Sequence, residues 1–431
     1  MEDRKRWLDG LRGIAAAIVA WFHFTLGEMK IPYRGFWDEP VEQNHHFIQL
    51  PPFRMPFAGK AMVTLFFVIS GYSVPLAIIR LRGQNNNSDC YRKLTSSVIR
   101  RCFRLYLPVI VVCMISQMLF FMGAYYSWSF SKKEGCPNAP PWSAIWGHLR
   151  CFALSLLSAL GFVEAEFASG LNPQLWTMLI ELKGSFAIYL AIIGLITATP
   201  NTRLMILALL NALFLYFGFQ ESFCFFSGLL LAELDVLNQV HLRAIAPVTH
   251  KAPSKKSRLP PAATLALFAG GIYLLCLPYR ETALEDYWYS SKLSVLPFWD
   301  HPIKRISTWW SIGSVMLVAA IRSLPCVKDM LESPIARFLG EISFPLYLLH
   351  QTFIRVLRNP ILNGVCWRFW GMSFEATRAD EAGSHVYYLS WMIAAAFIIP
   401  LLLVSATVMT RTVDRRSISL AHQVEDWFSG R

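Results

Sequence analysis

Charged residues are scarce in this chain. Lys, Arg, Asp and Glu make up 16% of its 431 residues, whereas 55% are hydrophobic. A soluble domain has about 25% charged residues, so the composition excludes an ordinary soluble protein and predicts one that crosses a membrane several times. The net charge of +12 is spread over loops. This spread argues against a nucleic-acid partner and fits attraction of cytosolic loops to anionic membrane lipid.

Several catalytic motifs are also absent. The sequence has no Gly-x-Ser-x-Gly elbow, no Gly-rich phosphate-binding loop and no His-Glu-x-x-His pair, which removes common hydrolase, nucleotide-binding and zinc-protease classes. Its nine cysteines form no Cys-x-x-Cys pair. Cys136, Cys151 and Cys366 fall on the predicted non-cytosolic side, where one disulfide among them is allowed but is not assigned by the sequence.

Long apolar stretches predict an all-α integral membrane protein, a bundle of about ten transmembrane helices in a single domain that covers residues 1–431. Such stretches suit helices that cross about 30 Å of hydrocarbon. The shorter stretch 148–163 is expected to form an interfacial or re-entrant helix. The predicted spans are 8–27, 59–79, 105–123, 174–197, 203–219, 220–237, 261–278, 306–321, 337–357 and 387–410.

The distribution of basic residues predicts the orientation of the bundle. With the N-terminus in the cytosol, the cytosolic segments hold 23 Lys and Arg residues and the non-cytosolic segments hold 12. Because cytosolic loops are richer in Lys and Arg, both termini are expected in the cytosol. The predicted basic cytosolic loops are 80–104 and 238–260. The chain is expected to be a multi-pass protein of an endomembrane or of the plasma membrane.

Two ionisable residues interrupt the first predicted span. Arg12 and His23 lie in LDGLRGIAAAIVAWFHFTLG, and ionisable groups at membrane depth are costly, so each indicates a functional site. They are eleven residues apart, which puts them on one helix face about 16 Å apart. This spacing suits a long ligand whose charged end is bound by Arg12 and whose reactive end is near His23. The alternative is a flanking arginine and a packing histidine.

Polar residues in later spans could belong to the same site. His350 in the ninth span and Glu181 in the fourth are predicted in the external half of the membrane, at the depth of His23. A His–carboxylate pair suits a general base because the carboxylate fixes the imidazole tautomer. A structural role is also open: Tyr347 and His350 share a helix face, and Ser70 suits close helix packing.

A basic segment precedes the third predicted span. Arg101 and Arg104 are three residues apart on a predicted helix, so they can act together on a polyphosphate. With Arg12, they are expected to surround the cytosolic mouth of the bundle. Basic residues at this position are also explained by orientation alone.

Five segments in this order resemble the membrane-bound acyltransferase family 3. LDGLRGIAAAIVAWFHF carries its Arg-x10-His signature at Arg12 and His23, FFVISGY resembles its second-span motif, and RRCFRLYLP resembles its Arg-x-x-Arg segment. LWTMLIELKGSF is similar to its Trp-Ser/Thr-x-x-x-Glu segment in a fungal form. GEISFPLYLLH is similar to its late Ser-Tyr-x-x-Tyr-Leu-x-His block, with Phe344 in place of the common Tyr.

The resemblance implies transfer of an acyl group, often acetyl, from acyl-CoA as co-substrate to a hydroxyl group, without a bound cofactor or metal. It implies that Arg12 binds the CoA end and that His23 is the catalytic histidine, with Glu181 and His350 as further catalytic candidates. The acceptor is expected to be a secondary metabolite or a glycan. The candidate contacts to this acceptor are Tyr347, Ser70 and Trp176.

Two other functions fit parts of the sequence. A secondary transporter also has about ten helices with buried charges, but neither an inverted repeat nor a matching pair of broken helices is present. A lipid-directed acyltransferase would carry His-x-x-x-x-Asp, whereas His23 is followed by Glu28 at that position. We therefore expect an integral-membrane O-acyltransferase in which acyl-CoA arrives from the cytosol and His23 activates the acceptor hydroxyl.

Overall fold

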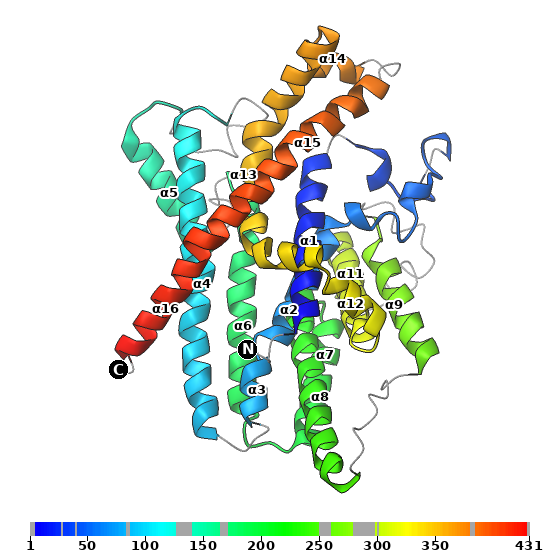
Figure 1. The fold of residues 1–431 in the computed structure, drawn as a ribbon, viewed down its shortest axis with the longest axis vertical. Coiled ribbons are helices and arrows are strands. Elements are labelled where there is room, and N and C mark those ends of the chain that lie inside the picture. The colour runs from blue at the N-terminus through cyan, green and yellow to red at the C-terminus, as the bar shows by residue number, and fades with distance from the viewer. Residues whose placement is uncertain are drawn as a thin grey trace. The chain divides into compact units, whose positions relative to one another are not determined.

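The computed structural model consists of helices joined by loops, and Figure 1 draws no strand in the part of the chain that it describes. The predicted all-α class is therefore confirmed for that part. The structure describes residues 5–26, 29–38, 41–82, 87–125, 140–163, 171–249, 260–278, 298–299, 301–379 and 384–428.

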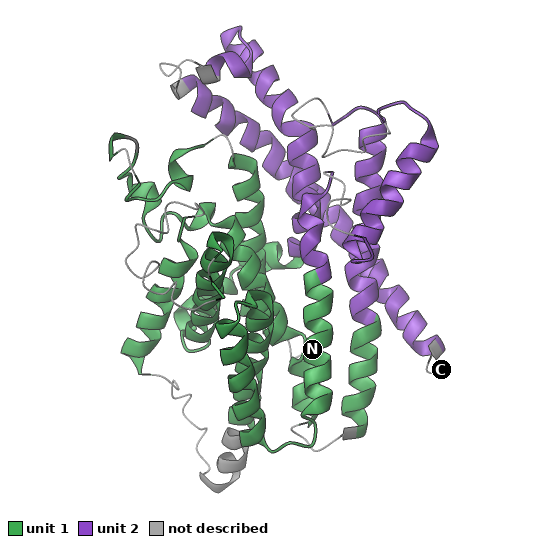
Figure 2. Ribbon diagram, turned by 180° about the vertical axis from the view of Figure 1, so that it is seen from behind, with its two compact units in different colours: residues 1–99, 180–341 green, residues 100–179, 342–431 purple. Residues whose placement is uncertain are grey.

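The chain forms two compact units, coloured separately in Figure 2. Unit 1 comprises residues 1–99 and 180–341, and unit 2 comprises residues 100–179 and 342–431. The helices α4 (Asn87–Phe121), α6 (Trp176–Gly194) and α13 (Pro334–Trp370) contribute to both. The other helices of unit 1 are α1 (Arg6–Thr25), α2 (Gly59–Ser73), α3 (Leu76–Arg82), α7 (Pro200–Tyr216), α8 (Gln220–Thr249), α9 (Pro261–Leu275), α11 (Pro302–Ile321) and α12 (Pro325–Leu331). Those of unit 2 are α5 (Ile145–Ala159), α14 (Phe374–Ala379), α15 (Ser384–Met409) and α16 (Arg415–Phe428).

Each of the ten predicted spans overlaps a helix, and the span 59–79 includes both α2 and α3. Among the described residues, five helical stretches are long and apolar enough to cross a membrane, and α11 with α12, which meet at a bend of 103°, make a sixth if they are one span. The helices α5, α7 and α9 are apolar but shorter. The structure thus supports a membrane protein with five to six clear spans, and the count of ten stays a prediction. The five are Gly59–Arg82, Ser88–Phe121, Pro173–Gly194, Gln220–Val240 and Val386–Trp427.

The two predicted basic loops are partly helical, which corrects the sequence analysis. Helix α4 begins at Asn87, inside loop 80–104, and helix α8 continues to Thr249, inside loop 238–260. In the first of these loops neither Gly nor Pro follows Gly83, so no helix-breaking residue stops the helix. Hydropathy predicts where the apolar part of a helix ends. It does not predict where the helix itself ends, which depends on a helix-breaking residue or a turn.

Glycines allow α1 to approach its neighbours closely. A Cβ atom on Gly13 would lie 2.3 Å from the backbone nitrogen of Gly340, so the two backbones are in direct contact. Towards the other end of α1, a Cβ atom on Gly59, the first residue of α2, would lie 2.4 Å from the Cβ atom of Phe22. Small residues permit such close helix packing in membranes. These contacts fix α1 near both Arg12 and His23.

The structure shows which of the three predicted non-cytosolic cysteines can belong to the predicted disulfide. Cys151 is disulfide-bonded, whereas Cys366 is a buried free thiol 3.3 Å from the hydroxyl of Ser390. Cys136 lies outside the described residues. Disulfides persist in oxidising compartments, so the bond at Cys151 agrees with the predicted non-cytosolic side of its segment.

Cysteine labelling at the two ends of α11 tests the predicted orientation. Cys326 follows α11 on the predicted cytosolic side, Lys304 lies near its start on the other side, and both are exposed. In sealed membrane vesicles with the cytosolic face outward, we expect an impermeant maleimide to label Cys326, and Lys304→Cys only after permeabilisation. Cys326→Ser is the control. The opposite pattern would invert the topology, and labelling of both in sealed vesicles would show that α11 does not span the membrane.

Candidate functional site

Arg12 lies in the first half of α1 and contacts α2. Its Nη2 donates a hydrogen bond to Ser73 Oγ at 3.2 Å, and its Nη1 lies 3.7 Å from Asp9 Oδ1, one turn earlier. The side chain keeps 23% of its surface exposed. Because part of its surface is open to solvent, the guanidinium can be reached by a phosphate, which its planar fork suits.

His23 lies in the last turn of α1 in aromatic surroundings. It is half-buried, and its ring centroid is 5.0 Å from that of Phe22 in an edge arrangement. The ring of Phe22 in turn contacts Tyr33 at 5.5 Å. The surroundings of His23 are therefore aromatic, in contrast to the charged and hydroxyl groups around Arg12.

The segment between α1 and α2 covers the His23 end with a hydrogen-bonded structure that the sequence analysis did not identify. The Tyr33 hydroxyl donates to the Phe22 carbonyl oxygen at 3.0 Å and lies 2.6 Å from the Thr25 hydroxyl. Burial is the main cause that raises the pKa of Tyr33 to about 12, so this phenol stays protonated at neutral pH. Buried Arg54 donates to the carbonyl oxygens of Pro32, at 3.1 Å, and of Cys276.

Glu181 and Ser70, both predicted site residues, are brought together within unit 1. Ser70 Oγ donates to Glu181 Oε1 at 2.9 Å, and both side chains are buried. Lys183 is exposed, as expected for a residue on another face of α6. Ser70 lies one turn from Ser73, the partner of Arg12, and about 16 Å along α2 from Gly59. Glu181 therefore lies nearer in depth to Arg12 than to His23, so direct pairing of Glu181 with His23 stays a prediction.

Tyr347 and His350 form a buried cluster in unit 2. The Tyr347 hydroxyl lies 2.9 Å from Thr177 Oγ1 and donates to the Gln174 carbonyl oxygen at 3.3 Å. His350 is fully buried, and its Nδ1 lies 2.6 Å from the Tyr347 carbonyl oxygen. The predicted shared face is confirmed, since the two rings are 5.6 Å apart. The cluster binds α6 to α13 within unit 2, and a catalytic role for His350 stays a prediction.

The other predicted site residues are more exposed. Trp176, at the start of α6, has 52% of its surface exposed. Arg101 is half-buried on α4, and Arg104, one turn further, lies 4.0 Å from Asp414 with a side chain that is 48% exposed. Their roles towards the acceptor and the CoA phosphates stay predictions.

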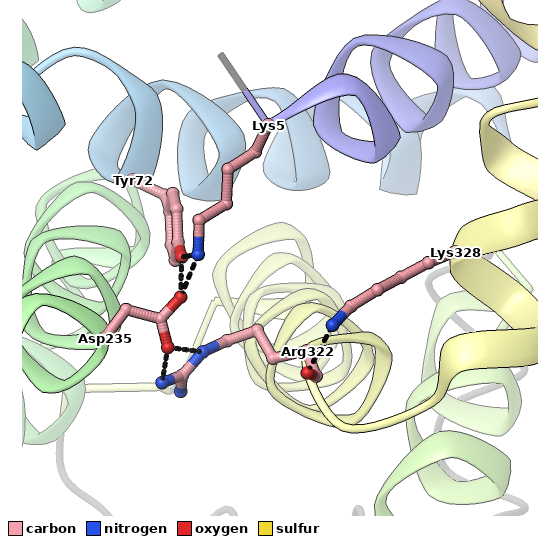
Figure 3. A network of polar contacts seen from close by, with 5 residues as sticks. All are labelled: Lys5, Tyr72, Asp235, Arg322 and Lys328. Atoms are coloured by element: carbon pink, nitrogen blue, oxygen red, sulfur yellow. Dashed lines mark hydrogen bonds and ion pairs between the residues drawn. The ribbon is translucent and has the colours of Figure 1, made fainter. Parts of the chain in front are cut away.

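A network of charged and polar residues joins five segments of unit 1 (Figure 3). Asp235 of α8 accepts hydrogen bonds from the Lys5 ammonium, from the Tyr72 hydroxyl of α2 and from Arg322, which follows α11 and whose Nε lies 3.0 Å away. The Lys5 ammonium also donates to Tyr72 at 2.7 Å. The Lys328 ammonium donates to the Arg322 carbonyl oxygen at 2.7 Å.

A second ion cluster in unit 1 is buried more deeply. Arg82 of α3 donates to Glu233 of α8, whose other carboxylate oxygen lies 3.7 Å from Arg203 Nε of α7. Buried ion pairs hold elements in register at a cost in desolvation. Glu233 and Asp235 were not predicted as residues of interest, although both lie in the predicted span 220–237. The rule applied to Arg12, that ionisable residues at membrane depth need an explanation, would have identified them.

Comparisons with known proteins agree on one enzyme class. The family model described as an acyltransferase domain matches residues 5–410. The O-acetyltransferase PaAT-1 of Phomopsis amygdali is 27% identical over 389 residues, which cover 82% of this chain and 73% of that protein. The acyltransferase clz18 of Cochliobolus lunatus is 24% identical over 387 residues, 80% of this chain and 81% of that protein. The acyltransferase R4 of a Phoma species is 24% identical over 425 residues, 89% of each protein. No solved structure matches the chain.

The family match includes all five segments on which the resemblance was based, together with the helices that carry Arg12, Glu181 and His350. It favours an acyltransferase over the transporter alternative. With its apolar helices and this match across nearly its whole length, the chain belongs to acyltransferase family 3, as a membrane acyltransferase.

Proposed function

We propose that the protein is an integral-membrane O-acyltransferase that moves an acetyl group from acetyl-CoA to a hydroxyl of a small natural product or a glycan. The observation that carries the proposal is the geometry of α1. Its Arg12 end is charged and partly open to solvent, its His23 end is lined by aromatic rings, and helix packing fixes both. The O-acetyltransferase name of the Phomopsis amygdali relative supports acetyl as the group transferred.

In this proposal His23 acts as general base. Its imidazole takes the proton of the acceptor hydroxyl as the oxygen attacks the thioester carbonyl carbon. A tetrahedral intermediate forms, and the carbon–sulfur bond then breaks. The thiolate of CoA receives the proton back from the imidazolium, which leaves an acetyl ester and CoA. No atom or electron is left over, so the step needs no metal and no second co-substrate.

Glu181 has a place in this proposal that follows from its depth. Bonded to Ser70, it lies nearer to the level of Arg12 than to that of His23, and it would act on His23 through a bound acceptor or a water molecule. His350, or Tyr347 beside it, remains a candidate for polarising the thioester carbonyl or binding the acceptor. The exposed ring of Trp176 remains a candidate contact to the acceptor.

The pair Arg101 and Arg104 remains a separate candidate for a CoA phosphate, because its side chains are solvent-accessible on α4. Acetyl-CoA is supplied in the cytosol, so this role and that of Arg12 both require the predicted orientation. We propose an endomembrane or the plasma membrane as the location, with the acceptor reaching the opposite half of the membrane.

Transfer from isotope-labelled acetyl-CoA tests the proposed function. The full-length protein, purified in lipid nanodiscs, is incubated with labelled acetyl-CoA and a lysate of small metabolites, and products are identified by mass spectrometry. We expect a labelled acetyl ester that does not form with boiled protein. Label that stays in acetyl-CoA or is released only as acetate would contradict the proposal. Uptake of a metabolite by proteoliposomes without acetylation would favour a transporter.

Replacement of Arg12 by Lys should weaken binding of acetyl-CoA while the protein stays folded. Lysine keeps the positive charge but lacks the planar fork that contacts two phosphate oxygens. We expect the KM for acetyl-CoA to rise about tenfold, as for the loss of one charge-assisted hydrogen bond. Arg337→Lys, an exposed arginine in the first turn of α13, is the matched control. A KM unchanged from wild type would show that Arg12 only sets orientation.

A further inference from the structure

His23 lies in the last turn of α1, where the backbone of a helix is least constrained. α1 ends at Thr25, and Leu26 follows with an extended backbone. The carbonyl groups at the end of a helix lack amide partners in the helix, so the last turn frays unless other groups bind them. A general base must lie within hydrogen-bond distance of the proton that it takes. The groups that hold this turn therefore bear on the proposed reaction.

The Tyr33 hydroxyl binds α1 on both sides of His23 in the sequence. It donates to the Phe22 carbonyl oxygen at 3.0 Å and lies 2.6 Å from the Thr25 hydroxyl. The Phe22 carbonyl belongs to the peptide group that includes the His23 nitrogen, and such a group is planar and stiff. The Tyr33 ring also packs against that of Phe22, with 5.5 Å between the centroids. Tyr33 therefore holds the backbone directly before His23 and the side chain two residues after it.

Thr25 connects this contact to the helix itself. Its hydroxyl donates to the Trp21 carbonyl oxygen at 2.9 Å, one turn earlier, and the side chain is fully buried. The Leu26 amide donates to the Phe22 carbonyl oxygen at 2.8 Å. A threonine that bonds back to a carbonyl four residues earlier is common in helices. In α1 this bond is joined to a tyrosine from another segment.

The segment that carries Tyr33 is itself fixed by buried side chains. Arg54 donates to the Tyr33 carbonyl oxygen at 3.4 Å and to the carbonyl oxygen of Cys276, which follows α9. Gln49 donates to the Ile31 carbonyl oxygen at 3.1 Å. Both side chains are buried, and buried hydrogen-bonded networks make a structure rigid. Tyr33 thus contacts α1 from a support that is bound to the end of α9.

We propose that Tyr33 is a positioning residue for His23. Its hydroxyl, together with that of Thr25, fixes the last turn of α1 so that the imidazole meets the acceptor hydroxyl. Tyr33 itself touches no substrate and transfers no proton. This inference rests on the proposed function for the role of His23, and it adds to the reaction a residue from outside α1. The effect of Tyr33 should appear in kcat and leave the KM for acetyl-CoA unchanged, since Arg12 lies about 16 Å away along α1.

Removal of the Tyr33 hydroxyl gives the test, with steady-state rates measured on the full-length protein in nanodiscs. Tyr33→Phe keeps the ring, and we expect kcat to fall about tenfold, because a small displacement of a reacting group forfeits part of its contribution. Thr25→Val, of similar shape but without the hydroxyl, should act in the same direction. Thr25→Ser keeps the hydroxyl and should retain most of the activity.

The matched control is a tyrosine that makes the same kind of bond in unit 2. The Tyr106 hydroxyl donates to the carbonyl oxygen of Ala159, the last residue of α5, at 3.2 Å. Tyr106→Phe removes one hydroxyl from the end of a helix that carries no proposed catalytic residue, so kcat should stay at the wild-type value. An equal loss in Tyr106→Phe and Tyr33→Phe would overturn the inference, because it would show a general loss of stability.

A double variant separates positioning of His23 from an independent role of Tyr33. A residue that acts only through His23 has no further effect once the imidazole is gone. Tyr33→Phe combined with His23→Gln should therefore be as active as His23→Gln alone. Losses that multiply in the double variant would overturn the inference, as would a wild-type kcat in Tyr33→Phe or a change confined to the KM for acetyl-CoA.

Hydrogen exchange of the same preparations gives a readout that needs no activity. In Tyr33→Phe the amides of residues 22–26 should exchange faster than in wild type, whereas those around Arg12 should not change. Equal exchange in the two proteins would overturn the inference. If wild type transfers no acetyl group, the proposed function fails, and the exchange still decides whether Tyr33 fixes the last turn of α1.

Discussion

Replacement of His23 by glutamine should lower acetyl transfer by at least about a hundredfold, because a positioned general base contributes about 10² to 10⁴ in rate. Glutamine keeps hydrogen bonding and approximate size but cannot accept a proton. Binding of acetyl-CoA should stay close to wild type, since Arg12 lies about 16 Å away along α1. Steady-state rates and CoA binding on the same preparation measure the two effects separately.

The control for this variant is an exposed histidine. His422 lies on α16 with a side chain that is 52% exposed, and His422→Gln should retain wild-type activity. If His23→Gln retains more than about a tenth of the activity, His23 is not the base. His350 would then be the next candidate, and the reaction would have to be assigned to the Tyr347–His350 cluster of unit 2.

Substitution of Gly13 should destabilise the fold, and the more so the larger the new side chain. A Cβ at this position would lie 2.3 Å from the nitrogen of Gly340 and 2.4 Å from the carbonyl carbon of Leu339, both backbone atoms that cannot turn aside. Overpacking commonly costs about 1–3 kcal/mol and more where the backbone must move. We expect Gly13→Ala to lower the Tm clearly and Gly13→Val to abolish recovery of monodisperse protein, as measured by size exclusion and thermal unfolding in detergent.

A second helical glycine supplies the matched control. Nothing lies within 4 Å of a Cβ on Gly194, at the end of α6. Gly194→Ala should therefore be neutral or stabilising by up to about 1 kcal/mol, because alanine loses less backbone entropy in a helix. Equal Tm values for Gly13→Ala and Gly194→Ala would contradict the close contact of α1 with Gly340.

The positions of the helices were predictable because hydrophobic length is a property of the sequence alone. The start of α4 and the end of α8 were not predictable, because hydropathy does not distinguish polar helical turns outside a membrane from a loop. The tight packing of Gly13 against Gly340 was equally hidden, although both glycines lie in segments that the sequence analysis singled out. Small residues indicate a close approach, but the partner helix depends on the tertiary fold.

The candidate site was predictable as a set of residues but not as a set of contacts. The spacing of three residues was enough to predict that Tyr347 and His350 share a helix face. Topology alone put Glu181 at the depth of His23, whereas its bond to Ser70 fixes it closer to Arg12. Depth predicted by counting turns has an error of several residues, because a span can shift along the membrane normal. The three partners of Asp235 come from three other segments of the chain, which no local pattern connects.

Because α1 is in close contact with other helices at two places, the number of residues between these contacts is constrained. Gly13 is held at Gly340 and Phe22 at Gly59, with eight residues between Gly13 and Phe22. Insertion or deletion of one residue would turn the far end by about 100° and shift it by about 1.5 Å. Evolution can therefore exchange side chains in this stretch while its length stays the same.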